Sequence, residues 1–148
     1  MPEFQLAGPG PGLALLLGGF GAGPENLRPL ALRLQSLGLT VVVSALGRHT
    51  GDEALFERSR TWHYYADALR VLRRVAPDGS GPVLLGGYST GALVALLLAV
   101  RHPDRAAGLV LLSPVLRTAR ARTQLVGYSF GGLYYLALPL AAAGAPGA

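Results

Sequence analysis

Ser89 lies in the sequence Gly87-Tyr88-Ser89-Thr90-Gly91, between two apolar stretches of the chain. The stretch before it, Val83–Tyr88, has the length of a buried strand, and residues 92–101 after it have the length of a helix. A serine at such a strand-to-helix turn has a strained backbone, an exposed hydroxyl and a free N–H group in the residue that follows. This arrangement suits nucleophilic attack on an acyl carbon.

Glycines give this turn the room it needs. A β-carbon at Gly87 or Gly91 would crowd the strand and the helix where they approach each other. A second Gly-x-Ser-x-Gly sequence spans Gly127–Gly131 and contains Ser129. Only Leu125 and Val126 precede it as strand-forming residues, so it lacks a full strand, and the first motif is preferred as the site of the nucleophile.

Short apolar runs recur along the chain and predict the strands that would position Ser89. They are Leu13–Leu17, Leu39–Val43, Val83–Tyr88 and Leu109–Leu112. Helical patterns separate them, and this alternation indicates an α/β fold with a parallel sheet, helices on both faces and right-handed crossovers. Ser89 is then expected at the carboxyl ends of the strands, where ligands bind in such sheets.

Capping residues and apolar spacing predict three helices between these strands. Asn26 can cap the first helix, with Pro29 in its first turn, and Gly38 ends it. The third helix, which follows Ser89, is apolar nearly all round and is expected in the centre of the fold. The second helix shows one apolar face at helical spacing, made up of Trp62, Tyr65, Ala66, Leu69, Leu72 and Ala76.

Composition limits the classes of function. The chain has 148 residues, 51% of them hydrophobic and 14% charged, which fits one globular domain. It has no cysteine, which excludes disulfides and thiolate metal sites. All 13 basic residues are arginines, but they are scattered and not interleaved with aromatic residues, so no nucleic-acid partner is expected. No signal peptide is evident at the N-terminus, and a cytoplasmic protein is expected.

Residues 123–148 contain no charged side chain. A membrane span, an apolar cap over a lipid-like substrate site, and a segment packed on the fold all fit this composition. Gly131-Gly132 and Pro139 interrupt the run, which argues against a stable membrane span. The chain is therefore divided into a core, residues 1–116, and a C-terminal segment, residues 117–148, that is cap-like or incompletely defined.

Glycine-rich loops after strands also occur in nucleotide-binding proteins. Here Gly19-x-Gly21 follows the first strand, but Pro24 stands where the dinucleotide fingerprint has its third glycine. The second strand has no carboxylate near its end, and the chain has no lysine for a phosphate-binding loop. No cofactor and no metal are expected. The loop suits donation of a backbone N–H to an oxyanion instead.

Five stretches of the chain match a known pattern in the right order and spacing. They are Leu15–Phe20, 23–30, Leu46–Gly51, Gly87–Gly91 and 102–114. Through these stretches, residues 13–116 resemble the front half of an α/β-hydrolase of the esterase, monoacylglycerol lipase and lysophospholipase type. In that family they correspond to the oxyanion strand and turn, the next helix, a loop with glycine and histidine, the nucleophile elbow and the connection into the next strand. Gly18 stands where a histidine is usual in the family's oxyanion turn.

The resemblance implies a serine hydrolase of carboxylic esters, with a small-molecule substrate such as a lipid or acylglycerol ester. Ser89 would be its nucleophile, and the N–H groups of Phe20 and Thr90 would form the oxyanion hole. Gly19 and His49 would lie near the site, although a loop-structuring role suits His49 better than that of a general base. The sequence does not indicate an oligomeric state.

In this family the acid and the histidine of the triad follow the nucleophile. After Ser89 the chain has one carboxylate, Asp104, and one histidine, His102, and neither matches the family's catalytic positions. His102 is expected to cap a helix, and His63 to lie on the surface. The chain is thus expected to be a hydrolase that ends early or that has lost its catalytic second half. A catalytically incomplete scaffold with an interaction role is the alternative.

Overall fold

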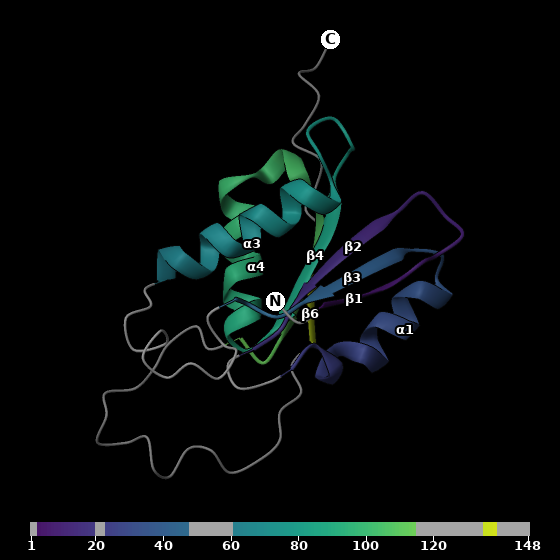
Figure 1. Ribbon diagram of the computed structural model, residues 1–148, viewed down its shortest axis with the longest axis horizontal. Coiled ribbons are helices and arrows are strands. Elements are labelled where there is room, and N and C mark those ends of the chain that lie inside the picture. The colour runs from purple at the N-terminus through teal and green to yellow at the C-terminus, as the bar shows by residue number, and fades with distance from the viewer. Residues whose placement is uncertain (1–2, 20–22, 48–60, 115–134, 139–148) are drawn as a thin grey trace.

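The molecule is built on a six-stranded sheet with the strand order β1-β3-β2-β4-β5-β6 (Figure 1). A computed structural model of the chain describes residues 3–19, 23–47, 61–114 and 135–138. The strands are β1 (Glu3–Leu6), β2 (Leu13–Leu17), β3 (Thr40–Ser44), β4 (Val83–Tyr88), β5 (Ala106–Leu112) and β6 (Tyr135–Leu138).

The four strands predicted from the sequence form the parallel centre of the sheet. β3, β2, β4 and β5 are neighbours in that order, and each pair is parallel. Leu15 of β2 is level with Val42 of β3 and with Leu85 of β4. Continuous apolar runs form these strands because helices cover the sheet on both sides and leave no face to water.

Both edges of the sheet differ from the prediction. β1 pairs antiparallel with β3, and β6 pairs antiparallel with β5, so the sheet is mixed. The sequence analysis assigned no strand to Glu3–Leu6 or Tyr135–Leu138. β6 lies within the uncharged segment 123–148, and the rest of that segment falls outside the described residues.

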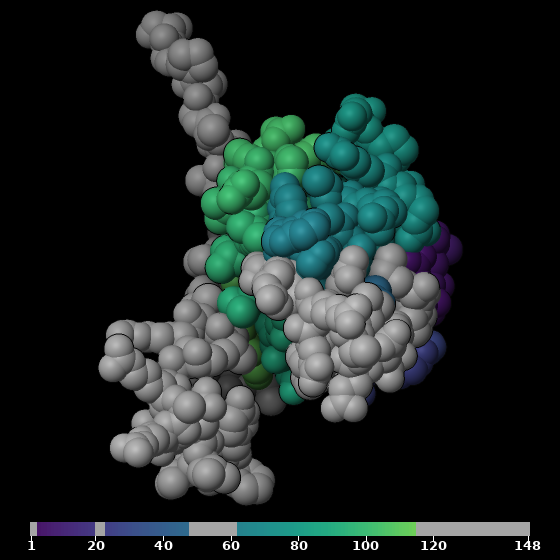
Figure 2. Space-filling view, turned by 60° about the vertical axis from the view of Figure 1, so that its left-hand side comes forward, coloured from purple at the N-terminus to yellow at the C-terminus, as the bar shows by residue number. Residues whose placement is uncertain are grey.

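Helices lie on both faces of the sheet, as predicted (Figure 1). η1 (Pro24–Leu27) and α1 (Arg28–Ser36) cover one face, where Ala31 packs with Leu16 and Val43. α3 (Thr61–Val75) and α4 (Thr90–Arg101) cover the other, and Leu72 and Leu98 pack there with Leu15 and Leu85. The short η2 (Pro103–Arg105) connects α4 to β5. In Figure 2, α3 lies beside the green C-terminal end of α4.

Two details of the helices correct the sequence analysis. Asn26 does not cap α1: it lies inside η1, and Leu27 is the N-cap of α1, without a side-chain hydrogen bond. Trp62 is 64% exposed, so the buried face of α3 is turned away from it. That face carries Tyr64, Ala68, Val71 and Leu72.

The end of α1 is formed as the sequence predicts. Gly38 has a φ of +96°, and its N–H donates to the Gln35 carbonyl at 2.8 Å. Glycine adopts this left-handed backbone without the steric penalty that a β-carbon brings. Among the described residues, no helix is long and apolar enough to cross a membrane.

Candidate functional site

Ser89 forms the sharp turn between β4 and α4. Its φ of 54° and ψ of −116° are strained for a residue with a β-carbon, and it is the N-cap of α4. The neighbouring strand holds the turn, because the Ser89 N–H donates to the Leu112 carbonyl at 2.9 Å. The serine therefore stands at the carboxyl ends of β4 and β5, where an open α/β sheet binds its ligands.

Gly87 and Gly91 allow the strand and the helix to approach closely. A β-carbon on Gly87 would lie 2.4 Å from the Gly91 carbonyl carbon, and one on Gly91 would lie 2.1 Å from the Leu17 carbonyl oxygen. Both distances are far below van der Waals contact. The start of α4 thus lies directly against the end of β2, which brings the loop after β2 to Ser89.

Gly19 lies in that loop, and it packs against the turn. A β-carbon there would lie 2.8 Å from the Tyr88 carbonyl oxygen and 3.1 Å from the Ser89 β-carbon. The Gly18 N–H donates to the Ser44 carbonyl at 2.9 Å, which ties the loop to the end of β3. Phe20, the next residue, and His49 lie outside the described residues.

The amino end of α4 places positive partial charge beside Ser89. The Ala92 N–H donates to the Ser89 carbonyl at 3.1 Å, and the Leu93 N–H does so at 3.3 Å. Thr90 is the first residue of the helix, so its N–H has no carbonyl partner within the helix. Such an N–H group and the helix dipole favour a negative charge at this point.

His102 and Asp104 lie at the opposite end of α4. The helix has 12 residues between Ser89 and His102, which at 1.5 Å per residue places the histidine about 18 Å away. His102 is the C-cap of α4, as predicted, and its Nε2 is 2.8 Å from the Tyr65 hydroxyl. Neither His102 nor Asp104 can therefore reach a substrate at Ser89.

His63 lies in the first turn of α3, with its ring 3.6 Å from that of Trp62. It is partly buried and not simply a surface residue. In the part of the chain that the structure describes, no group of three or more histidine, aspartate or glutamate side chains is placed to hold a metal ion.

Ser113 is a residue at this edge of the sheet that the sequence analysis missed. It follows the Leu112 carbonyl that accepts from Ser89, and its φ is also positive, at 46°. A non-glycine residue in this region of φ marks a constrained turn. In the sequence, Ser113 could have been found as a polar residue that directly follows an apolar strand and precedes Pro114.

Comparison with known proteins agrees with this geometry. A pimeloyl-[acyl-carrier protein] methyl ester esterase from Aromatoleum aromaticum is 39% identical over 98 residues, which are 66% of this chain and 35% of that protein. The chain thus spans about a third of the length of the curated relative that it matches.

Solved structures share the fold. One, from a study of the metagenome-derived lipolytic enzymes LipS and LipT, has a TM-score of 0.70 and 22% identity, over 85% of this chain and 51% of its own. A thioesterase domain from the curacin biosynthetic pathway has a TM-score of 0.65 and 25% identity, over 84% of this chain and 46% of its own.

The family model Hydrolase_4, described as serine aminopeptidase, S33, matches residues 15–143. This range begins in β2 and includes the turn at Ser89. With the four parallel central strands, the helices on both faces and the turn at the carboxyl end of β4, the match places the chain in this hydrolase family of the α/β-hydrolase superfamily.

Proposed function

We propose that Ser89 is the nucleophile of a serine hydrolase that cleaves carboxylic esters. The observation that supports this most is the left-handed backbone of Ser89 between β4 and α4. A non-glycine residue in this conformation is destabilised by roughly 1–3 kcal/mol, which is unexpected at a turn that glycine could form. A requirement for the serine hydroxyl at this position explains why the strain is retained.

The reaction would begin with attack of the Ser89 Oγ on the acyl carbon. A bond forms between Oγ and that carbon, the Oγ proton passes to a base, and the carbonyl oxygen becomes an oxyanion. The Thr90 N–H and the N–H of Phe20, the residue that follows Gly19, would hold the oxyanion. Cleavage of the ester C–O bond releases the alcohol, which takes up the proton, and water then hydrolyses the acyl-serine.

The base and its acidic partner are assigned to residues other than His102 and Asp104, because about 18 Å separates His102 from Ser89 along α4. We place them outside the described residues, in a longer protein or in another chain. His49 is the first candidate base within this chain.

Small-molecule carboxylic esters, including lipid and acylglycerol esters, are the proposed substrates. The names of the relatives support an ester, since one is a methyl ester esterase and another structure comes from a study of lipolytic enzymes. Hydrolysis of p-nitrophenyl acetate and of long-chain p-nitrophenyl esters would be measured side by side, to compare short-chain with lipid-like substrates. A preference for the long chain is expected if the substrate is a lipid.

Fluorophosphonate labelling tests the nucleophile. The probe should modify the intact chain slowly, mass spectrometry should place the adduct on Ser89, and Ser89→Ala should abolish it. Ser129→Ala is the matched control, because Ser129 lies in the second Gly-x-Ser-x-Gly sequence, and it should leave labelling unchanged. An adduct on Ser129, or labelling that survives Ser89→Ala, would contradict the proposal.

A non-enzymatic scaffold is the second candidate. It is favoured by one observation, that the histidine and the carboxylate after Ser89 lie at the far end of α4. The downstream reading frame of the gene separates the two. Further strands followed by an Asp or Glu and then a His support the hydrolase, whereas an authentic stop codon and a chain that is never labelled support the scaffold.

A further inference from the structure

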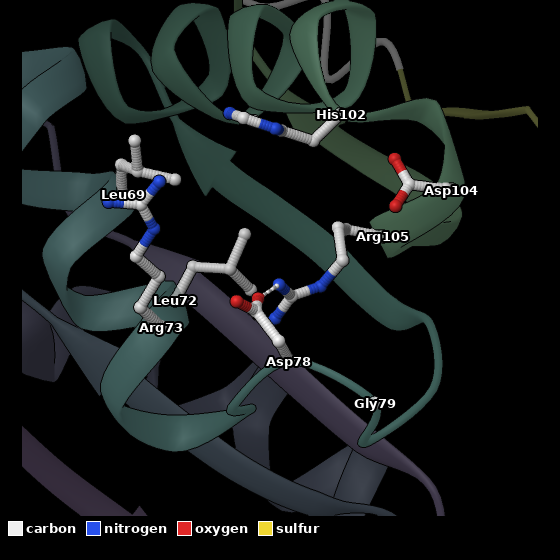
Figure 3. Close-up of a pocket in the computed structure, with 8 residues that line it drawn as sticks. All are labelled: Leu69, Leu72, Arg73, Asp78, Gly79, His102, Asp104 and Arg105. Carbon is white, nitrogen blue, oxygen red and sulfur yellow. Dashed lines mark hydrogen bonds and ion pairs between the residues drawn. The ribbon is translucent and has the colours of Figure 1, made fainter.

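A cavity of about 250 Å³ lies at the edge of the sheet opposite Ser89 (Figure 3). Leu69, Leu72 and Arg73 of α3 form one wall. The turn that leads into the amino end of β4, and η2, which leads into the amino end of β5, contribute the remainder. The cavity is therefore separate from the proposed catalytic edge by the length of α4.

Arg105 of η2 is fixed in position beside this cavity. Its side chain is 14% exposed and contacts the Asp78 carboxylate at 2.5 Å. It also donates to the Ala76 carbonyl. A guanidinium group has five N–H donors, so these two contacts leave donors to spare on a side chain that is already held in place.

Arg73 differs from the other arginines of α3. Arg70 pairs with Asp67 at 2.9 Å, and Arg74 pairs with Glu3 at 2.5 Å. Arg73 has no ion pair with any residue that the structure describes, and it lines the cavity. The α3 wall thus presents a positive charge without a carboxylate partner.

Asp104 presents the opposite charge from the η2 side (Figure 3). Within the described part of the chain it makes no ion pair, because Arg105 is bonded to Asp78 instead. His102 also lines the cavity, and its Nε2 is engaged with the Tyr65 hydroxyl at 2.8 Å. A lone cation and a lone anion therefore remain on different walls, with Leu72 between them (Figure 3).

We infer that this cavity binds a compact zwitterion, with its carboxylate at Arg73 and its ammonium group at Asp104. A simple anion would meet Asp104 and Asp78, and a simple cation would meet the two arginines, so neither complements the whole lining. A volume of about 250 Å³ is below that of most drug-sized sites, which restricts the ligand to the size of an amino acid.

Linear ω-amino acids provide the test, because their length varies while their end groups stay the same. Glycine, β-alanine, 4-aminobutyrate and 6-aminohexanoate would be titrated into the ¹⁵N-labelled chain, with butyrate and butylamine as single-charge analogues. At least one zwitterion should shift the amide signals of Arg73, Gly79 and Asp104 saturably. It should bind at least about tenfold more tightly than either analogue, which is the effect of losing one charge-assisted contact.

Variants assign the two ends of the ligand. Arg73→Gln should reduce the affinity for the best zwitterion to that of butylamine, and Asp104→Asn should reduce it to that of butyrate. Arg70→Gln is the matched control: Arg70 lies on the same helix but is bonded to Asp67 and does not line the cavity, so binding should not change.

Three results would overturn the inference. Equal affinity for butyrate and 4-aminobutyrate would mean a simple anion site. Binding that Arg73→Gln leaves intact would place the ligand elsewhere. No saturable shift with any ligand would mean that the cavity is not a binding site for a zwitterion. The length series uses the unsubstituted chain, so the test holds even if a variant fails to fold.

Discussion

At the residue scale, the backbone of Ser89 can be tested without any measurement of activity. Ser89→Ala keeps a β-carbon at a φ of 54°, whereas Ser89→Gly removes it. This positive-φ conformation costs roughly 1–3 kcal/mol for a residue with a β-carbon. Glycine avoids that cost, but it loses more conformational entropy on folding, which offsets part of the stabilisation. Ser89→Gly should therefore have a free energy of unfolding about 1 kcal/mol above that of Ser89→Ala, measured by urea denaturation. Equal stabilities would mean that the turn is unstrained.

Gly91 gives the sharpest steric prediction. Alanine is normally favoured over glycine within a helix by about 1 kcal/mol. Here the added β-carbon would lie 2.1 Å from the Leu17 carbonyl oxygen, so Gly91→Ala should instead destabilise the fold by about 1–3 kcal/mol or more. Gly23→Ala is the control, because its β-carbon would have no neighbour within 4 Å among the residues that the structure describes. A Gly91→Ala variant as stable as the parent in urea would show that α4 does not approach β2 this closely.

The sequence predicts only the part of the site that lies within one short stretch of the chain. Ser89, Gly87 and Gly91 lie within five consecutive residues, and the apolar runs on both sides of them complete the pattern that predicts a strand-to-helix turn. The contact of Ser89 with Leu112 depends on the register between β4 and β5, and no residue pattern encodes that register. The positions expected for Phe20 and His49 fall outside the described residues and remain predictions.

At the scale of elements, the parallel strands were predictable because each is a continuous apolar run between helical patterns. β1 was missed although its four residues alternate between polar and apolar types, as in a half-buried strand. So short a run is a weak signal, and its pairing with β3 involves residues about 40 positions away. Glu3 pairs with Arg74 at 2.5 Å, and the Arg28 guanidinium lies 4.3 Å above the centre of the Phe4 ring. Arg28 also bonds Glu25 and lowers the pKa of that carboxyl below its usual value.

For the second helix, α3, the sequence predicts the element but not which of its faces is buried. Its apolar spacing predicts a helix, but its orientation about its own axis follows from the neighbours against which it packs. Trp62 was expected in the apolar face and is 64% exposed, whereas Tyr64 is buried. Periodicity identifies the element, and tertiary packing decides which of two overlapping apolar faces points to the core.

The attachment of β1 predicts the effect of Phe4→Ala. The variant removes partly buried apolar surface next to the α1 side of the core, together with the contact to Arg28. It should lower the free energy of unfolding by about 1–3 kcal/mol, measured by urea denaturation. Trp62→Ala is the control, because that side chain is 64% exposed, and a surface change of this kind should have an effect within about 0.5 kcal/mol. If the two variants were equally stable, β1 would not contribute to the fold.

At the scale of the whole molecule, α4 separates two chemically different edges of the sheet. Ser89 and Ser113 occupy the carboxyl edge, and the charged cavity with His102, Asp104 and Arg105 occupies the amino edge. The chain spans 35% of the curated relative and about half of the solved lipolytic structure, with 51% covered. Under the proposed function, hydrolysis would therefore depend on a base and an acid that the described fold does not bring to Ser89.

This arrangement predicts that the 148-residue chain hydrolyses p-nitrophenyl esters only weakly. A serine hydroxyl is a poor nucleophile at neutral pH unless a base takes its proton. In serine proteases, loss of triad members leaves about 10³–10⁴-fold acceleration over water, which comes from the oxyanion hole and binding. The residual activity of the chain should therefore depend only modestly on Ser89.

A longer protein that supplies the acid and the histidine should be faster by several orders of magnitude and fully dependent on Ser89. The measurement is the turnover of the 148-residue chain and of its Ser89→Ala variant, beside the same pair in the longer protein. Turnover of the short chain near an ordinary enzyme's ~10 s⁻¹, abolished by Ser89→Ala, would contradict the prediction. A base would then lie within this chain or its oligomer, and loss of that turnover in His49→Ala, with retention in His102→Ala, would identify it.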